Sequence, residues 1–149
     1  MRVLGLDLGT RTLGVSISDE TKFIATPVAT IRYEEGDYPY LLEKLEKVLN
    51  EFQVETIVLG LPKNMDNSMG EHALMSVDFK ELLEEKLKIP VVLQDERLST
   101  VEATNYMITF DISRKKRKKK VDSLAANIIL QTYLDKRKGN EYARRKNDF

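Results

Sequence analysis

Three acidic positions in this sequence stand where a fold usually avoids charge. Asp7 ends the first apolar run, the pair Asp95 and Glu96 ends a later one, and Asp122 opens an apolar stretch with helical spacing. An isolated carboxylate at the end of a buried strand costs several kcal/mol unless a partner neutralises it, and a divalent cation is a natural partner. Three such acids far apart in the sequence therefore predict one metal-binding site that the fold assembles.

The chemistry that suits such a site is hydrolysis of a phosphodiester bond. This reaction needs a nucleophilic water, stabilisation of charge at phosphorus and support for the leaving oxygen, and two carboxylate-held divalent ions about 4 Å apart can supply all three. Mg2+ prefers oxygen ligands and keeps exchangeable waters, so Mg2+ (or Mn2+) is the expected cofactor. Each acid also has a structural interpretation, as a turn former, an ion-pair partner or a helix-start residue, so only the set carries the prediction.

The hydrophobic pattern predicts the elements that must position these acids. Strands are expected over residues 3–8, 13–18, 27–31, 56–59 and 91–94, and helices over residues 38–52, 71–87, 99–110 and 121–139. Short turns join the first three strands, which favours antiparallel pairing, whereas helices lead to the last two, which favours parallel pairing. The expected fold class is α/β, with a mixed five-stranded sheet of three antiparallel strands followed by two parallel ones, and helices on both faces.

Length and composition describe a single soluble domain. The 149 residues are enough for one core, which we expect over residues 1–139, followed by a basic, flexible tail over residues 140–149. The sequence has no cysteine, no apolar run long enough to cross a membrane and no signal-peptide pattern at its N-terminus. These features predict a cytoplasmic protein without a membrane partner.

Charge is distributed unevenly along the chain, although the formal net charge is zero. Residues 114–149 carry thirteen Lys and Arg against four Asp and Glu, whereas residues 1–113 carry eleven against twenty. Seven consecutive basic residues, 114–120, stand just before Asp122. Such a run fits a clamp on nucleic-acid phosphates, in which Lys118, Lys119 and Lys120 bring the backbone next to the metal site. A solvated run without a partner is the alternative.

Four further residues are candidates for contacts with nucleic acid. Arg11 follows the first acid and Arg97 follows the second, where a guanidinium could meet the scissile phosphate or form a structural ion pair. Lys63 and Asn64 lie in a turn-rich loop over residues 60–70. They could contact a nucleic-acid backbone or serve only as turn residues.

Four motifs, in this order, resemble the YqgF (RuvX) family over almost the whole chain, to about Leu134. The motifs are Gly5-Leu6-Asp7-Leu8-Gly9, Gly60-Leu61-Pro62-Lys63-Asn64-Met65-Asp66, Asp95-Glu96-Arg97-Leu98-Ser99-Thr100 and Val121-Asp122-Ser123-Leu124-Ala125-Ala126. This family comprises bacterial pre-16S rRNA nucleases, once regarded as Holliday junction resolvases. One departure is Asn67, where the family loop usually has Gly; Asn tolerates the left-handed backbone that such a turn needs.

The resemblance implies an RNase H-like fold, with metal-bound acids from the first strand, a later strand and the last helix. By position these acids are Asp7, one of Asp95 and Glu96, and Asp122. We favour Glu96, because its longer side chain can reach a metal at the edge of the sheet. The implied activity is processing of the 5′ end of pre-16S rRNA, with structured nucleic acid and ribosomal particles as partners.

Other functions stay open at this point. A Holliday junction resolvase acting on branched DNA, or a non-catalytic nucleic-acid-binding assembly factor, would carry the same charges. The segment Asp7-Leu8-Gly9-Thr10 also looks like the first phosphate loop of the actin and sugar-kinase group. That group needs a second such domain to close over nucleotide, and 149 residues leave no room for it. The sequence does not separate endonuclease from exonuclease action, or monomer from dimer.

Overall fold

The computed structural model describes residues 1–64, 66–96 and 124–147, the part from residue 139 onward in its backbone alone. Among these residues, five strands form one sheet in the order β3-β2-β1-β4-β5. They are β1 (Arg2–Leu8), β2 (Thr12–Ser18), β3 (Ala25–Arg32), β4 (Val54–Leu61) and β5 (Val91–Asp95). The β1–β2 and β2–β3 pairs are antiparallel, and the β1–β4 and β4–β5 pairs are parallel. The predicted mixed sheet is confirmed.

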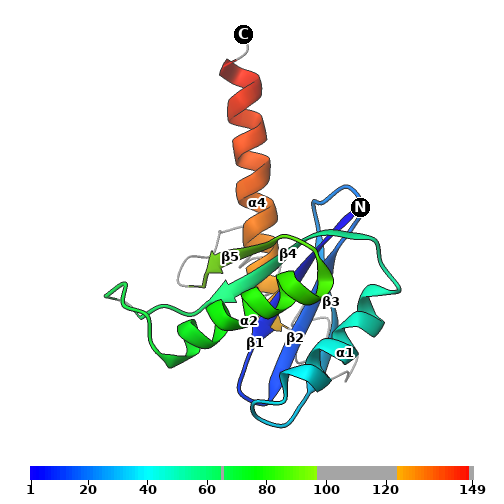
Figure 1. The fold of residues 1–149 in the computed structure, drawn as a ribbon. Coiled ribbons are helices and arrows are strands. Elements are labelled where there is room, and N and C mark those ends of the chain that lie inside the picture. The colour runs from blue at the N-terminus through cyan, green and yellow to red at the C-terminus, as the bar shows by residue number, and fades with distance from the viewer. Residues whose placement is uncertain (65, 97–123, 148–149) are drawn as a thin grey trace, which may run out of the picture.

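Helices cover both faces of the sheet, as predicted (Figure 1). On one face, α1 (Tyr38–Leu49) packs against β3, and α2 (Glu71–Leu87) packs against β4 and β5. On the other face, α4 (Leu124–Asn147) contacts β1, β2, β3 and β4. Each face has its own apolar core, a larger one that contains Phe79 of α2 and a smaller one that contains Leu130 and Leu134 of α4. The sheet is therefore buried on both sides.

The ends of α1 and α2 follow from local chemistry. The Asp37 side chain accepts a hydrogen bond from the Tyr40 amide at 3.3 Å and so caps the start of α1. At the end of α2, Lys88 adopts a left-handed backbone with φ 57, and Pro90 comes two residues later. The predicted bounds of α2 are confirmed, whereas α1 ends three residues earlier than predicted, at Leu49.

Other boundaries correct the sequence-based expectation. The strands predicted over 27–31 and 56–59 are longer, because pairing with β2 and β1 extends β3 and β4 beyond their apolar centres. The prediction that the last helix ends near Gly139 is wrong, since α4 continues to Asn147. A single Gly costs a helix only about 1 kcal/mol, and the Lys and Arg residues around it favour helix.

Some predicted features fall outside the residues that the structure describes. These are the helix over 99–110 and the start of the last helix at Val121. The division into a domain over 1–139 and a flexible tail over 140–149 stays a prediction. In the described part of the chain, no helix combines the length and the apolar character needed to cross a lipid bilayer.

Candidate active site

Asp7 lies near the C-terminal end of β1, on the face of the sheet that α4 covers. Alternate residues of a strand share a face, so Asp7 points to the same side as Gly5. A Cβ placed on Gly5 would lie 2.6 Å from the Cβ of Leu130, which shows that this side faces α4. The Asp7 side chain is half-buried there, close to the edge of the helix–sheet interface.

Glu96 follows β5 directly and reaches back across β4. Its amide donates to the carbonyl of Leu61 at 3.2 Å, which continues the parallel pairing beyond the last residue of β5. A Cβ placed on Gly60 would lie only 2.9 Å from the Glu96 Cδ and closer still to a carboxylate oxygen. The Glu96 carboxyl therefore lies over Gly60, in space that any other residue at position 60 would fill.

This path brings Glu96 to Asp7. Gly60 is the residue next to Leu59 on β4, and Asp7 is the residue next to Leu6 on β1, where Leu6 and Leu59 are paired. The side chain of Glu96 crosses that position and forms a hydrogen bond with Asp7. The two acids that sequence analysis placed on separate strands thus meet on one face of the sheet.

The electrostatics of the pair are those of two carboxyls that cannot both ionise freely. Burial, the Asp7 charge, a hydrogen bond with Asp7 and the Asp95 charge together raise the pKa of Glu96 to about 7, and burial is the largest of these causes. Near neutral pH the pair therefore holds a proton that a cation could replace. When both carboxylates are ionised they repel each other, and a bound cation would remove this repulsion. Their oxygen atoms are suitable ligands for a hard divalent metal such as Mg2+.

The first turns of α4 pack directly against Gly5 and Gly60. At Gly5 an added Cβ would lie 3.1 Å from the carbonyl oxygen of Ala126, and at Gly60 it would lie 2.6 Å from the Cδ1 of Ile129. The absence of side chains at both positions lets the first turns of α4 lie directly on β1 and β4. In the sequence, Asp122 comes four residues before Ala126.

Asp122 itself lies outside the residues that the structure describes, so its place in the site stays a prediction. Within the described ranges, no group of three or more Asp, Glu, His or Cys side chains is arranged to hold a metal. The part of the site that the structure shows is the pair Asp7 and Glu96. Asp95 acts on Glu96 through its charge.

Three of the predicted nucleic-acid contacts lie at this edge of the sheet. Arg11 is exposed in the turn between β1 and β2, and Lys63 and Asn64 lie in the loop that follows β4. The Asn64 side chain donates to the Ser68 hydroxyl at 3.0 Å, so it helps to hold the loop together. Arg97 and the predicted phosphate clamp Lys118, Lys119 and Lys120 lie outside the described residues.

The same loop explains the departure at Asn67. This residue adopts a left-handed backbone with φ 73, which few residues other than Gly and Asn adopt at low cost. Its amide donates to the carbonyl of Asn64 at 2.9 Å. The expectation that Asn preserves this turn in place of Gly is confirmed.

Two functional positions were missed by sequence analysis. Gly60 is the last residue but one of the buried run of β4, and a glycine there could have indicated a close approach by another group. Tyr33 is buried beside the turn that follows Asp7: its hydroxyl donates to the carbonyl of Gly9, and its amide donates to the carbonyl of Arg11 at 3.0 Å. Nothing in the sequence around Tyr33 indicates these bonds, because they depend on the pairing of β2 with β3.

Comparison with solved structures supports the fold. RuvC from Thermus thermophilus, solved in complex with a Holliday junction substrate, aligns with a TM-score of 0.60 at 15% identity, covering 93% of this chain and 96% of that one. Fowlpox virus resolvase aligns with a TM-score of 0.55 at 10% identity, covering 91% of this chain and 98% of that one. At such low identity the likeness concerns the fold alone, and it confirms the expected RNase H-like architecture.

Sequence comparison identifies the family. The model of the RuvX family, described as Holliday junction resolvase, matches residues 1–136. A protein of Geobacillus sp. (strain WCH70) named "Putative pre-16S rRNA nuclease" is 51% identical over 135 residues, which are 91% of this chain and 98% of that protein. A protein of the same name from Bacillus subtilis (strain 168) is 47% identical over 135 residues, again 91% of this chain and 98% of that protein. The chain therefore belongs to the RuvX family of nucleases.

Proposed function

We propose that this nuclease hydrolyses phosphodiester bonds near the 5′ end of precursor 16S rRNA, using Mg2+ or Mn2+ bound by Asp7, Glu96 and Asp122. The observation that carries the proposal is the contact between the Asp7 and Glu96 carboxyls at the edge of the sheet. The names of the curated relatives support the substrate, since proteins about half identical to this chain are named for pre-16S rRNA.

The described side chains fit the metal by their chemistry. Asp7 and Glu96 offer only oxygen ligands, and their mutual repulsion favours binding of a cation between them. When bound, a divalent ion supplies an activated water and neutralises charge at phosphorus. The chain contributes the geometry, because Gly60 leaves room for the Glu96 carboxyl beside Asp7.

The third acid is assigned from its position in the sequence. Asp122 precedes Leu124, the first described residue of α4, by two peptide units, so their α-carbons lie within about 7 Å of each other. The first turns of α4 lie on Gly5 and Gly60, next to Asp7 and Glu96. An acid just before this helix is therefore within reach of the same ion.

Basic residues around the pair are assigned to the substrate backbone. Arg11 lies in the turn after β1 and Lys63 in the loop after β4, both at the edge of the sheet that carries the acids. We assign Arg97 and the run Lys118, Lys119 and Lys120 to phosphate contacts as well. Asn64 acts through the shape of its loop, which its bond to Ser68 supports.

The same proposal sets the partners and the place of action. The substrate is structured RNA in the cytoplasm, either free or within a ribosomal particle. The nuclease domain is assigned to residues 1–139. Branched DNA remains the competing substrate, because its phosphates would meet the same basic residues.

The test is a cleavage assay on two end-labelled substrates, a precursor 16S rRNA leader and a four-way DNA junction. Each is incubated with Mg2+, Mn2+ or EDTA. We expect metal-dependent cleavage of the RNA. Asp7→Asn and Glu96→Gln should each reduce the cleavage rate by at least about 100-fold, the usual effect of removing a group that stabilises the transition state. Asp78→Asn, which changes an exposed acid on α2, is the matched control and should retain full activity.

Three results would contradict the proposal in different ways. Cleavage of the junction but not of the RNA would show that the substrate is wrong. Full activity of Asp7→Asn would show that the site is wrong. Loss of activity in Asp95→Asn with activity retained in Glu96→Gln would show that Asp95, not Glu96, is the ligand.

A further inference from the structure

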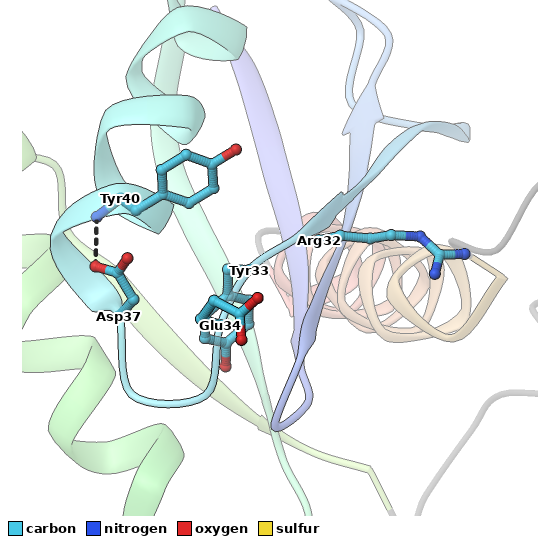
Figure 2. Close-up of a pocket in the computed structure, with 5 residues that line it drawn as sticks. All are labelled: Arg32, Tyr33, Glu34, Asp37 and Tyr40. Carbon is cyan, nitrogen blue, oxygen red and sulfur yellow. Dashed lines mark hydrogen bonds between the residues drawn. The ribbon is translucent and has the colours of Figure 1, made fainter.

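A cavity of about 250 Å³ lies between the end of β3 and the start of α1, at the edge of the sheet that also carries the turn after Asp7. It is lined by Arg32, Tyr33, Glu34, Asp37 and Tyr40 (Figure 2). Its volume is below the range of about 300–1,000 Å³ that is usual for sites binding whole drug-sized ligands, so it suits a single small unit of a larger molecule.

Hydrogen bonds connect this cavity to the active site. Tyr33, in the cavity wall, donates through its hydroxyl to the carbonyl of Gly9 and through its amide to the carbonyl of Arg11 at 3.0 Å. Gly9 and Arg11 belong to the turn that follows Asp7. Burial, with smaller contributions from Tyr38 and Glu35, raises the pKa of Tyr33 to about 12, so the hydroxyl stays protonated and keeps donating. The cavity and the acid pair therefore lie at the same edge of the sheet, on its two opposite faces.

Tyr40 gives the cavity an exposed aromatic surface. Its side chain is 41% exposed, although it is large and apolar. Its backbone amide is bonded to Asp37, and the ammonium of Lys44 lies 5.4 Å from its ring centroid. A ring that is fixed at its backbone and open to solvent is suited to stacking with a nucleobase.

Acidic side chains determine which part of a nucleotide can enter. Glu34 and Asp37 both line the cavity, and two carboxylates would repel a phosphate. Among the described residues, the Glu34 carboxylate makes no hydrogen bond or ion pair, so its oxygens are available as acceptors. The unit that fits is therefore neutral and carries hydroxyl or amino donors, as a ribose and its base do.

Arg32 provides the complementary charge on the side of the active site. Its side chain extends away from Tyr33, Glu34 and Tyr40 (Figure 2). Arg32 of β3 pairs with Thr12 of β2. Two residues further along β2, Gly14 pairs with Asp7 of β1. Arg32 and Asp7 therefore share the face of the sheet that α4 covers, and their α-carbons lie about 12 Å apart, across two strand spacings and two residues along the strand. A phosphate between the cavity and the acids would lie within reach of the guanidinium.

We propose that this cavity binds one unpaired nucleotide of an RNA substrate, a short distance along the strand from the scissile phosphate. Its base stacks on Tyr40, its ribose 2′-hydroxyl donates to the Glu34 carboxylate, and the adjoining phosphate pairs with Arg32. The proposal rests on the nuclease function and deepens it, because a bond to the 2′-hydroxyl distinguishes RNA from DNA. The preferred substrate is then RNA with a single-stranded segment at the cleavage point.

The test is a binding measurement with two labelled probes, an RNA hairpin with a single-stranded 5′ extension and a DNA of the same sequence. Fluorescence anisotropy is recorded with Asp7→Asn as the parent, so that no cleavage occurs. Tyr40→Ala should weaken RNA binding about 5- to 50-fold, whereas Tyr40→Phe should keep it within about twofold, because stacking needs only the ring. Arg32→Ala should weaken binding of both probes.

The RNA-specific part of the proposal is tested at Glu34. Glu34→Ala should weaken RNA binding about tenfold and leave DNA binding unchanged, since only the RNA loses a hydrogen bond to a charged acceptor. Glu35→Ala is the matched control: it removes the same charge from the neighbouring exposed position, which does not line the cavity. It should change the binding of the two probes equally.

The outcomes separate the two levels of inference. If the wild-type protein cleaves RNA but Tyr40→Ala and Glu34→Ala bind the RNA probe as the parent does, the cavity assignment is overturned while the nuclease function stands. Equal effects of Glu34→Ala on RNA and DNA would also overturn it. If the wild-type protein cleaves only the junction and the parent does not bind RNA, the proposed function itself fails.

Discussion

Replacement of Gly60 by Ala tests how the acid pair is built. The added Cβ would lie 2.6 Å from the Cδ1 of Ile129 and 2.9 Å from the Cδ of Glu96, whereas ordinary contacts begin at 3.4 Å. The Glu96 Cδ must therefore move by about 0.5 Å, the Ile129 methyl by about 0.8 Å, and the nearer Glu96 carboxylate oxygen by more than either. Both are the ends of flexible side chains, so the fold can accommodate the methyl group while the site cannot.

The expected effects on stability and activity differ accordingly. Overpacking of a core by one methyl group costs about 1–3 kcal/mol, and the lower end applies here because side-chain ends can yield. For a chain of this size, about 1 kcal/mol lowers the Tm by roughly 2–4 °C. A catalytic group displaced by up to about 1 Å can reduce the rate by about 100-fold. We therefore expect Gly60→Ala to lose 10- to 100-fold in kcat while it remains folded at the assay temperature.

The assay combines thermal unfolding with single-turnover cleavage of labelled precursor rRNA in Mg2+. Gly70→Ala is the matched control, because its Cβ would meet the Asn64 Nδ2 at an ordinary 3.5 Å. Gly5→Ala is the contrast: its Cβ would lie 2.6 Å from the Cβ of Leu130, which cannot move without α4, so stability should fall more than in Gly60→Ala. A Gly60→Ala protein with kcat within about twofold of the wild type would refute the argument that Gly60 makes room for Glu96.

Three further predictions follow from the charges. In EDTA at pH 8, Glu96→Gln should raise the free energy of unfolding in urea by about 1–2 kcal/mol, after allowance for solvent screening. Burial and Asp7 raise the pKa of Glu96 to about 7 in the folded protein, so its ionisation opposes folding at pH 8. The gain in stability should shrink as the pH falls from 8 towards 4.5, where Glu96 is protonated in the unfolded chain too. A Glu96→Gln protein that is less stable than the wild type at pH 8 would contradict this prediction. Partial burial raises the pKa of Asp19, but hydrogen bonds from Ile24, Thr21 and Phe23 outweigh it and lower this pKa to about 2. Asp19→Ala should therefore lower the Tm at pH 7. The difference in Tm between variant and wild type should vanish as the pH falls from 3.8 through 2. Replacing Lys118, Lys119 and Lys120 with Glu should sharply weaken RNA binding and flatten its salt dependence with little change in Tm; binding equal to wild type would show that the run is only solvated.

Much of the fold follows from patterns that depend on near neighbours in the sequence. The apolar runs ending at Asp7 and Asp95 predict buried strands, and the change of period after Tyr38 predicts a helix. The meeting of Asp7 and Glu96 could also be predicted, because parallel strands bring their carboxyl ends to one edge of the sheet. These inferences need only strand order and direction.

The rest depends on contacts between distant segments, which leave little trace in the local sequence. The role of Gly60 requires that Glu96 and Ile129 both approach it, from β5 and from α4. The cavity depends on the fit between the end of β3 and the capped start of α1, where residues 32–40 look like an ordinary charged turn. The true end of α4 was missed because Gly139 looks like a terminator, although a helix can continue through one glycine.

The length of α4 has a consequence for how the molecule rotates in solution. The 24 residues of α4 span about 36 Å. A compact globule of 149 residues, by comparison, has a radius of gyration of about 15 Å. The C-terminal half of the helix projects from the sheet (Figure 1), so the particle is elongated along the helix axis. Rotational diffusion is then slower about the short axes than about the long one. Amide N–H bonds in α4 lie along the long axis, so their transverse nuclear relaxation should be faster than that of amides in α1, at any concentration where the protein is monomeric.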